Sequence, residues 1–200
     1  MFLFLSIAVI GAIITFILNV WLGTPHFGYS WWLLALMIIA SIIAVVLIDA
    51  VFAWLPTALP EKCYKSDKGL YGSSKRRMRF YEKLGIKKWK DRIWELGSLN
   101  GFSKAAVTEP DNPAYFDRFI LESKIGILCH FLGGVFGFCV IFILPIEYAL
   151  VIGVPVGFVN LVINMMSFMV LKYNLPKLRV AKMRAERIAS RNQTKGESNE

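Results

Sequence analysis

The sequence predicts an all-α integral membrane protein with four transmembrane helices in two hairpins, joined by an amphipathic cytoplasmic insertion. Of its 200 residues, 56% are hydrophobic and 18% are charged, which is typical of membrane proteins. The apolar residues form four runs, each near the roughly 20 residues that a helix needs to cross about 30 Å of hydrocarbon. These runs are 2–22, 31–55, 125–144 and 148–171. Only helices satisfy their own backbone groups at this length in lipid, so each run is predicted to be a helix.

The charge divides the chain into four segments. Basic residues are confined to 61–124 and to the residues after Leu171, and the net charge is +9. Basic loops stay on the cytoplasmic side, so both termini are predicted to be cytoplasmic in a multi-pass protein. The predicted segments are a first hairpin (1–56), a basic amphipathic cytoplasmic segment (57–124), a second hairpin (125–172) and a basic cytoplasmic tail (173–200).

Polar residues inside the first hairpin are few, and they include Asn19 and Asp49. An acid inside a span is expected to face a cavity, a partner helix or the interface instead of lipid. Asp49 lies less than two helical turns before Pro56, which marks the cytoplasmic boundary. Proximity to the headgroups and contact with another helix therefore remain alternative explanations for Asp49.

The cytoplasmic segment mixes bases with aromatic residues. In 75–84, arginines alternate with Met78, Phe80 and Tyr81, which predicts a short amphipathic helix on an anionic membrane surface. A nucleic-acid binder has a similar composition. Both ends of this segment are tethered to spans, so membrane lipids with anionic headgroups are the predicted partners and nucleic acid is not.

The run Lys87, Lys88, Trp89 and Lys90 continues this basic face. One interpretation is a solvated surface that faces lipid headgroups. The other is that the lysines bind the phosphates of an activated acyl donor such as acyl-CoA, because ammonium groups commonly bind phosphate as point charges. The sequence leaves both interpretations open.

The second hairpin contains His130, and a histidine inside a span indicates a functional site. On a continuous helix, Glu122, Gly126 and His130 are spaced i, i+4, i+8 and lie along one stripe. The near-neutral pKa of histidine suits removal of a proton from a hydroxyl, although a neutral imidazole can equally hydrogen-bond a neighbouring helix. Asn160 and Asn164 lie one turn apart on the last span, where they either join helices or line a cavity that includes His130.

Several catalytic and metal-binding patterns are absent from the sequence. Neither histidine is followed five positions later by Asp, since His26 leads to Trp31 and His130 to Val135. There is no Gly-x-Ser-x-Gly motif and no paired Cys/His spacing. The sequence therefore predicts no metal site and no bound cofactor, with the acyl donor acting as a co-substrate. The polar stretch 193–200 is predicted to be disordered.

Four segments in a fixed order resemble the glycosyl-4,4'-diaponeurosporenoate acyltransferases of bacterial carotenoid synthesis. They are 87–91 (KKWKD), 101–104 (GFSK), 119–123 (FILES, leading to His130) and 172–178 (KYNLPKL). The resemblance implies a bacterial cell-membrane enzyme that transfers a fatty acyl group to a sugar hydroxyl of a glycolipid or glycosylated carotenoid. It also implies pigment or glycolipid pathway enzymes as partners.

On this reading, His130 is the general base and Glu122 is its orienter or a second acid–base group. Asn164, Tyr173 and Asn174 join Lys87, Lys88, Trp89 and Lys90 as substrate contacts. The sequence departs from the family at Ile125 and Ile127, where the family tends to carry an arginine and a glutamate. A non-catalytic membrane scaffold or lipid-binding protein is therefore the main alternative, and a small transporter component is a weaker one.

Overall fold

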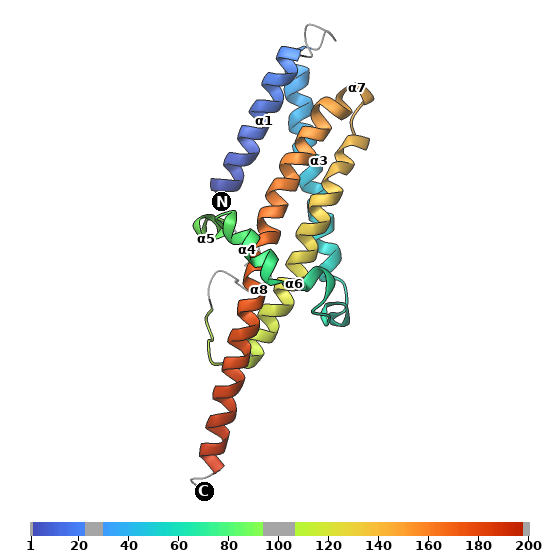
Figure 1. Ribbon diagram of the computed structural model, residues 1–200. Coiled ribbons are helices and arrows are strands. Elements are labelled where there is room, and N and C mark those ends of the chain that lie inside the picture. The colour runs from blue at the N-terminus through green and yellow to red at the C-terminus, as the bar shows by residue number, and fades with distance from the viewer. Residues whose placement is uncertain (1, 23–29, 94–106, 198–200) are drawn as a thin grey trace. The chain divides into compact units, whose positions relative to one another are not determined.

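The computed structural model describes residues 2–22, 30–93 and 107–197 (Figure 1). These residues form helices, turns and connecting segments, with no strand among them. Within the described part, four helices are long and apolar enough to cross a membrane, which confirms the predicted all-α membrane fold. The four are Leu3–Trp21, Trp31–Thr57, Pro113–Phe142 and Ile146–Asn192. His26 and the predicted 101–104 motif lie outside the described residues.

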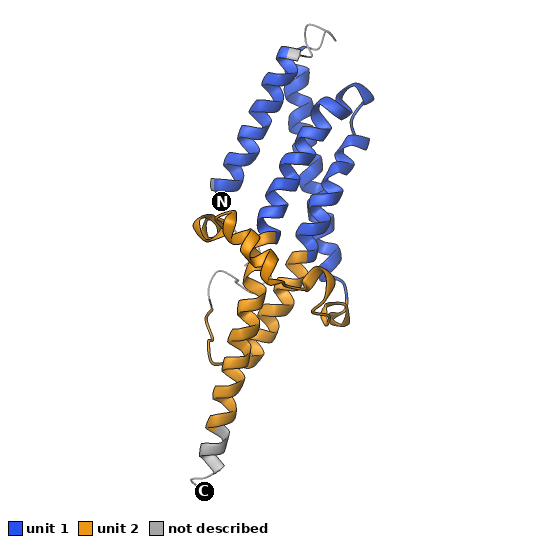
Figure 2. Cartoon of the chain, in the orientation of Figure 1, with its two compact units in different colours: residues 1–59, 128–168 blue, residues 60–127, 169–200 orange. Residues whose placement is uncertain are grey.

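The chain forms two compact units, each made from two stretches of sequence (Figure 2). Unit 1 comprises Met1–Leu59 and Leu128–Phe168, and unit 2 comprises Pro60–Ile127 and Met169–Glu200. Helices α6 (Pro113–Phe136) and α8 (Val154–Glu197) each contribute residues to both units.

Unit 1 is a set of apolar helices that lie side by side (Figure 2). Besides its parts of α6 and α8, it contains α1 (Phe2–Leu22), α3 (Trp31–Thr57), η5 (Gly137–Phe142), α7 (Ile146–Tyr148) and η6 (Ala149–Gly153). Its core packs Leu34, Ile38 and Val45 of α3 against Val140 and Ile152. Large apolar side chains also cover the outer surface of α1 and α3, as expected for helices surrounded by lipid.

A proline near the start of α8 leaves one backbone carbonyl of unit 1 without its usual helical hydrogen-bond donor. Pro155 has no N–H to donate to the carbonyl of Val151, four residues earlier. That carbonyl instead accepts a hydrogen bond of 2.8 Å from Nδ2 of Asn19 on α1. Asn19, a polar exception in the sequence of α1, therefore links two helices.

Unit 2 begins with the short helices η1 (Glu61–Tyr64) and η2 (Gly69–Tyr71), followed by α4 (Lys75–Lys83), α5 (Ile86–Trp89) and η3 (Lys90–Arg92). The amphipathic helix predicted at 75–84 is confirmed as α4. Ser74 caps it by accepting a hydrogen bond from the backbone N–H of Arg77. Gly85, at φ +68°, reverses the chain after α4 in a conformation that favours glycine.

The rest of unit 2 is formed by the first part of α6 and the second part of α8. Helix α6 begins after Asn112, whose Oδ1 accepts hydrogen bonds from the backbone N–H groups of Ala114 and Tyr115. Helix α6 is continuous through Glu122, Gly126 and His130, as their placement on one stripe requires. Its aromatic face, including Tyr115 and Phe119, packs on Leu178 and Ala185 of α8.

The prediction of a disordered end was wrong for residues 193–197, because α8 is helical through Glu197. Helix propagation costs little once a long helix exists. The preceding turns also contain strong helix formers and an ion pair between Lys182 and Glu186 at i, i+4.

Candidate functional site

A cluster of polar side chains lies inside the apolar helices of unit 1. We call Asp49, His130, Asn160 and Asn164 the polar cluster. They come from α3, α6 and α8, and both asparagines are buried, with 7% and 6% of their surface exposed. A buried polar group is costly unless it is hydrogen-bonded, so these side chains stabilise the structure only as a set.

The hydrogen bonds of the polar cluster form a connected series. Nδ2 of Asn164 donates to Oδ2 of Asp49 at 3.0 Å, and Nδ2 of Asn160 donates to Oδ1 of Asp49 at 3.2 Å. Oδ1 of Asn164 lies 3.0 Å from Nδ1 of His130. Asp49 is therefore connected to the imidazole of His130 through one amide group.

This arrangement relates the tautomer of His130 to the charge of Asp49. When Asp49 is ionised, its carboxylate can only accept, so the amide NH₂ of Asn164 faces Asp49 and the amide oxygen faces His130. An amide oxygen cannot donate, so Nδ1 of the neutral ring carries the proton. Nε2 then holds the basic lone pair. The partner of one ring nitrogen commonly fixes the state of the other in this way.

Two glycines, Gly133 of α6 and Gly137 of η5, make room for the polar cluster. A Cβ atom added to Gly133 would lie 2.8 Å from Oδ1 of Asp49, and one added to Gly137 would overlap Nδ2 of Asn160. The backbone carbonyl of Gly133 also accepts a hydrogen bond of 3.2 Å from Asn160. Small residues allow membrane helices to approach closely, and here they admit hydrogen-bonding side chains between the helices.

The structure thus brings together His130 and Asn164, two of the predicted site residues. It also adds Asp49, for which the sequence left two explanations, and shows that Asp49 contacts another helix. Asn160 and Asn164 join helices, the first of their predicted alternatives, and Asn164 also contacts His130. The available signal was a single acid and two amides in apolar spans, where such groups are expected to pair.

Glu122 belongs to unit 2, where it lines a shallow cleft of about 630 Å³. The charged residues of this cleft are Glu61, Lys65, Asp117, Arg118, Glu122 and Lys124. Charges of both signs therefore surround Glu122. One of these groups, Lys124, also donates hydrogen bonds to the backbone carbonyls of Tyr64 and Ser66.

The predicted donor-binding lysines lie on and next to α5. Lys87 forms an ion pair of 3.0 Å with Glu82, and Lys90 forms one of 2.6 Å with Asp91. The hydrogen bond between Glu82 and Lys87 lowers the pKa of Glu82 and raises the pKa of Lys87, so both are charged at neutral pH. Lys88 is exposed, and no salt bridge involves it in the described part of the chain.

The other predicted substrate contacts of unit 2 are Trp89, Tyr173 and Asn174, and most of their surface packs against neighbouring residues. Nε1 of Trp89 donates to the carbonyl of Leu84 at 3.1 Å. Tyr173 is 1% exposed, its hydroxyl donates to Glu82 at 3.3 Å, and Nζ of Lys177 lies 3.7 Å from the centre of its ring. Asn174 is partly exposed on α8. The sequence did not indicate that Tyr173 is a core residue.

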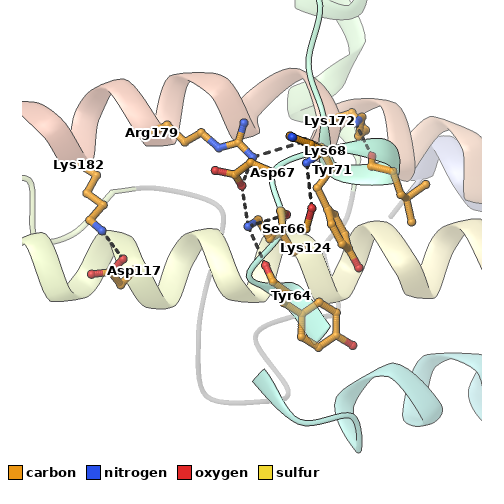
Figure 3. A network of polar contacts seen from close by, with 11 residues as sticks. Tyr64, Ser66, Asp67, Lys68, Tyr71, Asp117, Lys124, Lys172, Arg179 and Lys182 are labelled. Carbon is orange, nitrogen blue, oxygen red and sulfur yellow. Dashed lines mark hydrogen bonds and ion pairs between the residues drawn. The ribbon is translucent and has the colours of Figure 1, made fainter. Parts of the chain in front are cut away.

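Unit 2 also contains three cations that hold the segment 64–72, and we call Lys124, Lys172 and Arg179 the cationic cluster (Figure 3). Lys124 donates to the carbonyls of Tyr64 and Ser66, at 2.8 and 3.2 Å. Lys172 donates to the carbonyls of Leu70 and Gly72. Lys172 is buried, and these carbonyls replace water around its ammonium group.

Asp67 is the acid that accompanies the cationic cluster. It pairs with Lys124 at 2.7 Å and with Arg179 at 2.5 Å. Burial by itself raises the pKa of Asp67, but the hydrogen bond from Lys124 and the charges of Arg179 and Lys124 outweigh it, and the net pKa is lowered. Asp67 is therefore ionised at neutral pH and neutralised by its partners.

Together these features define a polytopic α-helical membrane protein with a histidine-centred polar cluster. In the described residues, no group of three His, Cys, Asp or Glu side chains is arranged to hold a metal ion. A family model described as glycosyl-4,4'-diaponeurosporenoate acyltransferase matches residues 60–185. The chain belongs to this family and has an acyltransferase-type function in carotenoid glycolipid synthesis. No curated protein and no solved structure gives a match.

The matched residues include His130, Asn160 and Asn164, whereas Asp49 lies before them. Three members of the polar cluster therefore lie within the matched range, and Asp49 lies outside it. Ile125 and Ile127, where the sequence was expected to depart from the family pattern, lie just before His130 on α6; Ile127 is fully buried.

Proposed function

We propose that the protein transfers a fatty acyl group from an acyl thioester to a sugar hydroxyl of a membrane glycolipid, with His130 as the general base. The observation that carries the proposal is the hydrogen-bonded series from Asp49 through Asn164 to His130. A positioned imidazole with its lone pair on Nε2 is suited to accept a proton from a hydroxyl near neutral pH.

The proposed reaction has two steps. Nε2 of His130 takes the hydroxyl proton while the sugar oxygen attacks the carbonyl carbon of the thioester. The carbon–sulfur bond then breaks, and the leaving thiolate takes the proton from the imidazolium ring. The products are an ester and a free thiol. Asn164 keeps its hydrogen bond to Nδ1 throughout, and Asp49 stabilises the positive charge that forms on the ring.

The other predicted residues complete the proposal. Glu122 serves as a second acid–base group from its cleft in unit 2. The lysines around α5 bind the phosphates of a donor such as acyl-CoA, with Lys88 as the first contact and Lys87 exchanging Glu82 for phosphate. Asn174 and the Tyr173–Glu82 pair contact the substrate at its polar end.

Helix α4 supports a contact between unit 2 and anionic lipid headgroups. It carries Lys75, Arg76, Arg77 and Arg79, and the ring of Phe80 is 54% exposed. Bases and an exposed aromatic on one short helix suit the boundary of an anionic leaflet. With basic segments on one side, both termini lie in the cytoplasm of a bacterial cell, and pigment or glycolipid enzymes are the proposed partners.

The test is lipid mass spectrometry of host membranes that contain the wild type, His130→Ala, His26→Ala or no protein, at matched expression. The proposal predicts a glycolipid that gains one fatty acyl mass with the wild type and with His26→Ala. Loss of general-base catalysis costs about 10²–10⁴-fold in rate, so His130→Ala is predicted to form almost no product.

An equal yield from His130→Ala would remove the base assignment. If no lipid changes with the wild type, the acyl-transfer proposal itself fails for this chain.

A further inference from the structure

An apolar cavity lies next to the polar cluster in unit 1, and the proposed function gives it no role. The cavity holds about 100 Å³ and lies among α1, α3 and α8. Small residues of α1, including Ala8 and Ala12, form one wall, and Ile42 and Val46 of α3 form another. Its size is comparable to apolar protein cavities of about 150 Å³ that take up benzene.

The cavity offers almost nothing to a water molecule. Its polar lining residues are Thr15 and Asn160. The hydroxyl of Thr15 already donates to the carbonyl of Gly11 at 2.8 Å, and the amide of Asn160 is hydrogen-bonded within the polar cluster. A buried water needs about two to four polar partners, so a hydrocarbon group is the better occupant.

Asn160 belongs both to this cavity and to the polar cluster. On α8, Val156, Asn160 and Asn164 are spaced i, i+4, i+8 and follow one stripe of the helix. Val156 lines the cavity, and Asn164 contacts His130. Val156 and Asn164 are eight positions apart, a separation of about 12 Å along the helix at 1.5 Å per residue. A chain whose carbonyl is at His130 can therefore extend along α8 into the cavity.

We infer that this cavity binds the distal part of the fatty acyl chain of the donor; the inference rests on the proposed function. A flexible chain can bend into a small space between helices, whereas a rigid polyene cannot. Lipid is as apolar as the cavity, so the cavity selects by shape and not by hydrophobicity. It therefore limits the length of the chain that His130 can process.

The test uses a fatty acyl-CoA that carries a diazirine near its methyl end, with the full-length protein in bilayers. After photolysis, cross-linked residues are mapped by mass spectrometry in the wild type, in Ala12→Leu, which fills the cavity, and in Ile42→Ala, which enlarges it. Ala40→Leu is the matched control, since Ala40 is exposed and lies outside the cavity lining. The acyl-chain length of the product is recorded for each variant.

The inference predicts labels on the cavity walls in the wild type and in Ala40→Leu, and a label at least fivefold weaker in Ala12→Leu. The preferred chain becomes shorter in Ala12→Leu and longer in Ile42→Ala. Labels outside the cavity, or unchanged labelling in Ala12→Leu, would overturn it. Equal labelling by a phosphatidylcholine with the same diazirine chain would assign the cavity to bilayer lipid instead.

The two proposals fail in different ways. If the wild type labels the cavity but forms no acylated glycolipid, the proposed function fails and the binding site stands. If it forms the product with labels elsewhere, the function stands and the cavity assignment fails.

Discussion

Each unit contains an acid with polar partners, Asp49 in unit 1 and Asp67 in unit 2, but the partners differ in charge. In unit 1, Asp49 accepts hydrogen bonds from two neutral amides. In unit 2, Asp67 is paired with two cations. Neutral amides add no positive charge beside Asp49, and in the proposed function Asp49 stabilises an imidazolium through Asn164. The cations around Asp67 neutralise its charge, and these ion pairs hold the segment 64–72 in place.

Under the proposed function, this difference separates a catalytic arrangement in unit 1 from an architectural one in unit 2. The same substitution in the two units is therefore expected to give different losses: activity in unit 1 and local structure in unit 2.

The largest effect is expected for Asp49→Asn. The new amide presents NH₂ to one of the two asparagine donors, so the amide of Asn164 is no longer held with its oxygen toward His130. We expect turnover to fall about 10³-fold, or roughly 4 kcal/mol of barrier. Acylated product per molecule of protein is the measurement, and Asp67→Asn is the matched control. Comparable activity losses in both variants would remove the distinction between the units.

The second effect concerns the cationic cluster. Lys124→Met leaves the carbonyls of Tyr64 and Ser66 without their buried donor, so we expect the protein to lose about 2–4 kcal/mol of stability. Limited proteolysis of the segment 64–72 measures this loss. Lys88→Met, at an exposed position, is the control and is expected to leave the cleavage rate unchanged. If the segment 64–72 is cleaved no faster in Lys124→Met than in the wild type, the proposed role of Lys124 in holding this segment would be contradicted.

A smaller effect is expected for Gly133→Ala. The added methyl group would crowd Oδ1 of Asp49, and the carboxyl group can move because it ends a side chain. We expect about a tenfold loss of turnover, or roughly 1.4 kcal/mol, with little change in thermal stability. Gly157→Ala in unit 1 serves as the comparison, because its added methyl group would crowd the ring of Phe138 at the same distance of 2.8 Å and lies away from Asp49. Wild-type turnover in Gly133→Ala would show that the position of Asp49 does not matter.

The smallest effect is an acid sensitivity of unit 2. The folded pKa of Asp67 is below its ordinary value, so its stabilising contribution is present above the unfolded pKa of about 3.9 and is lost as the pH falls through the folded pKa. Proteolysis of 64–72 is therefore expected to accelerate below about pH 4. In Asp67→Asn this acceleration should be absent; an identical acid response would assign it to another group.

Much of the fold could be predicted because it depends on local pattern. The four apolar runs, the alternation of bases and aromatics in α4, and the cap at Asn112 all act within a few residues. The environments of Lys124 and Lys172 could not be predicted, because their partners are backbone carbonyls 58 to 102 residues away. The end of α8 was missed because polar composition does not exclude a helix that is already propagating.

The candidate site was partly predictable for the same reason. His130 and Asn164 could be identified as polar groups in apolar spans. The sequence could not choose between headgroups and a helix as the partner of Asp49, since that contact joins residues 115 positions apart. It also gave no sign that Tyr173 is packed in a core.

The central claim is that Asp49 and Asn164 place the basic lone pair of His130 on Nε2. The chain has two histidines, so His26→Gln leaves a single imidazole for ¹⁵N-histidine labelling. Solid-state NMR of this protein in bilayers at neutral pH directly distinguishes the two tautomers. The account predicts a protonated Nδ1 and an unprotonated Nε2, with this preference lost when Asp49→Asn is added. A protonated Nε2 with an unprotonated Nδ1 would contradict it.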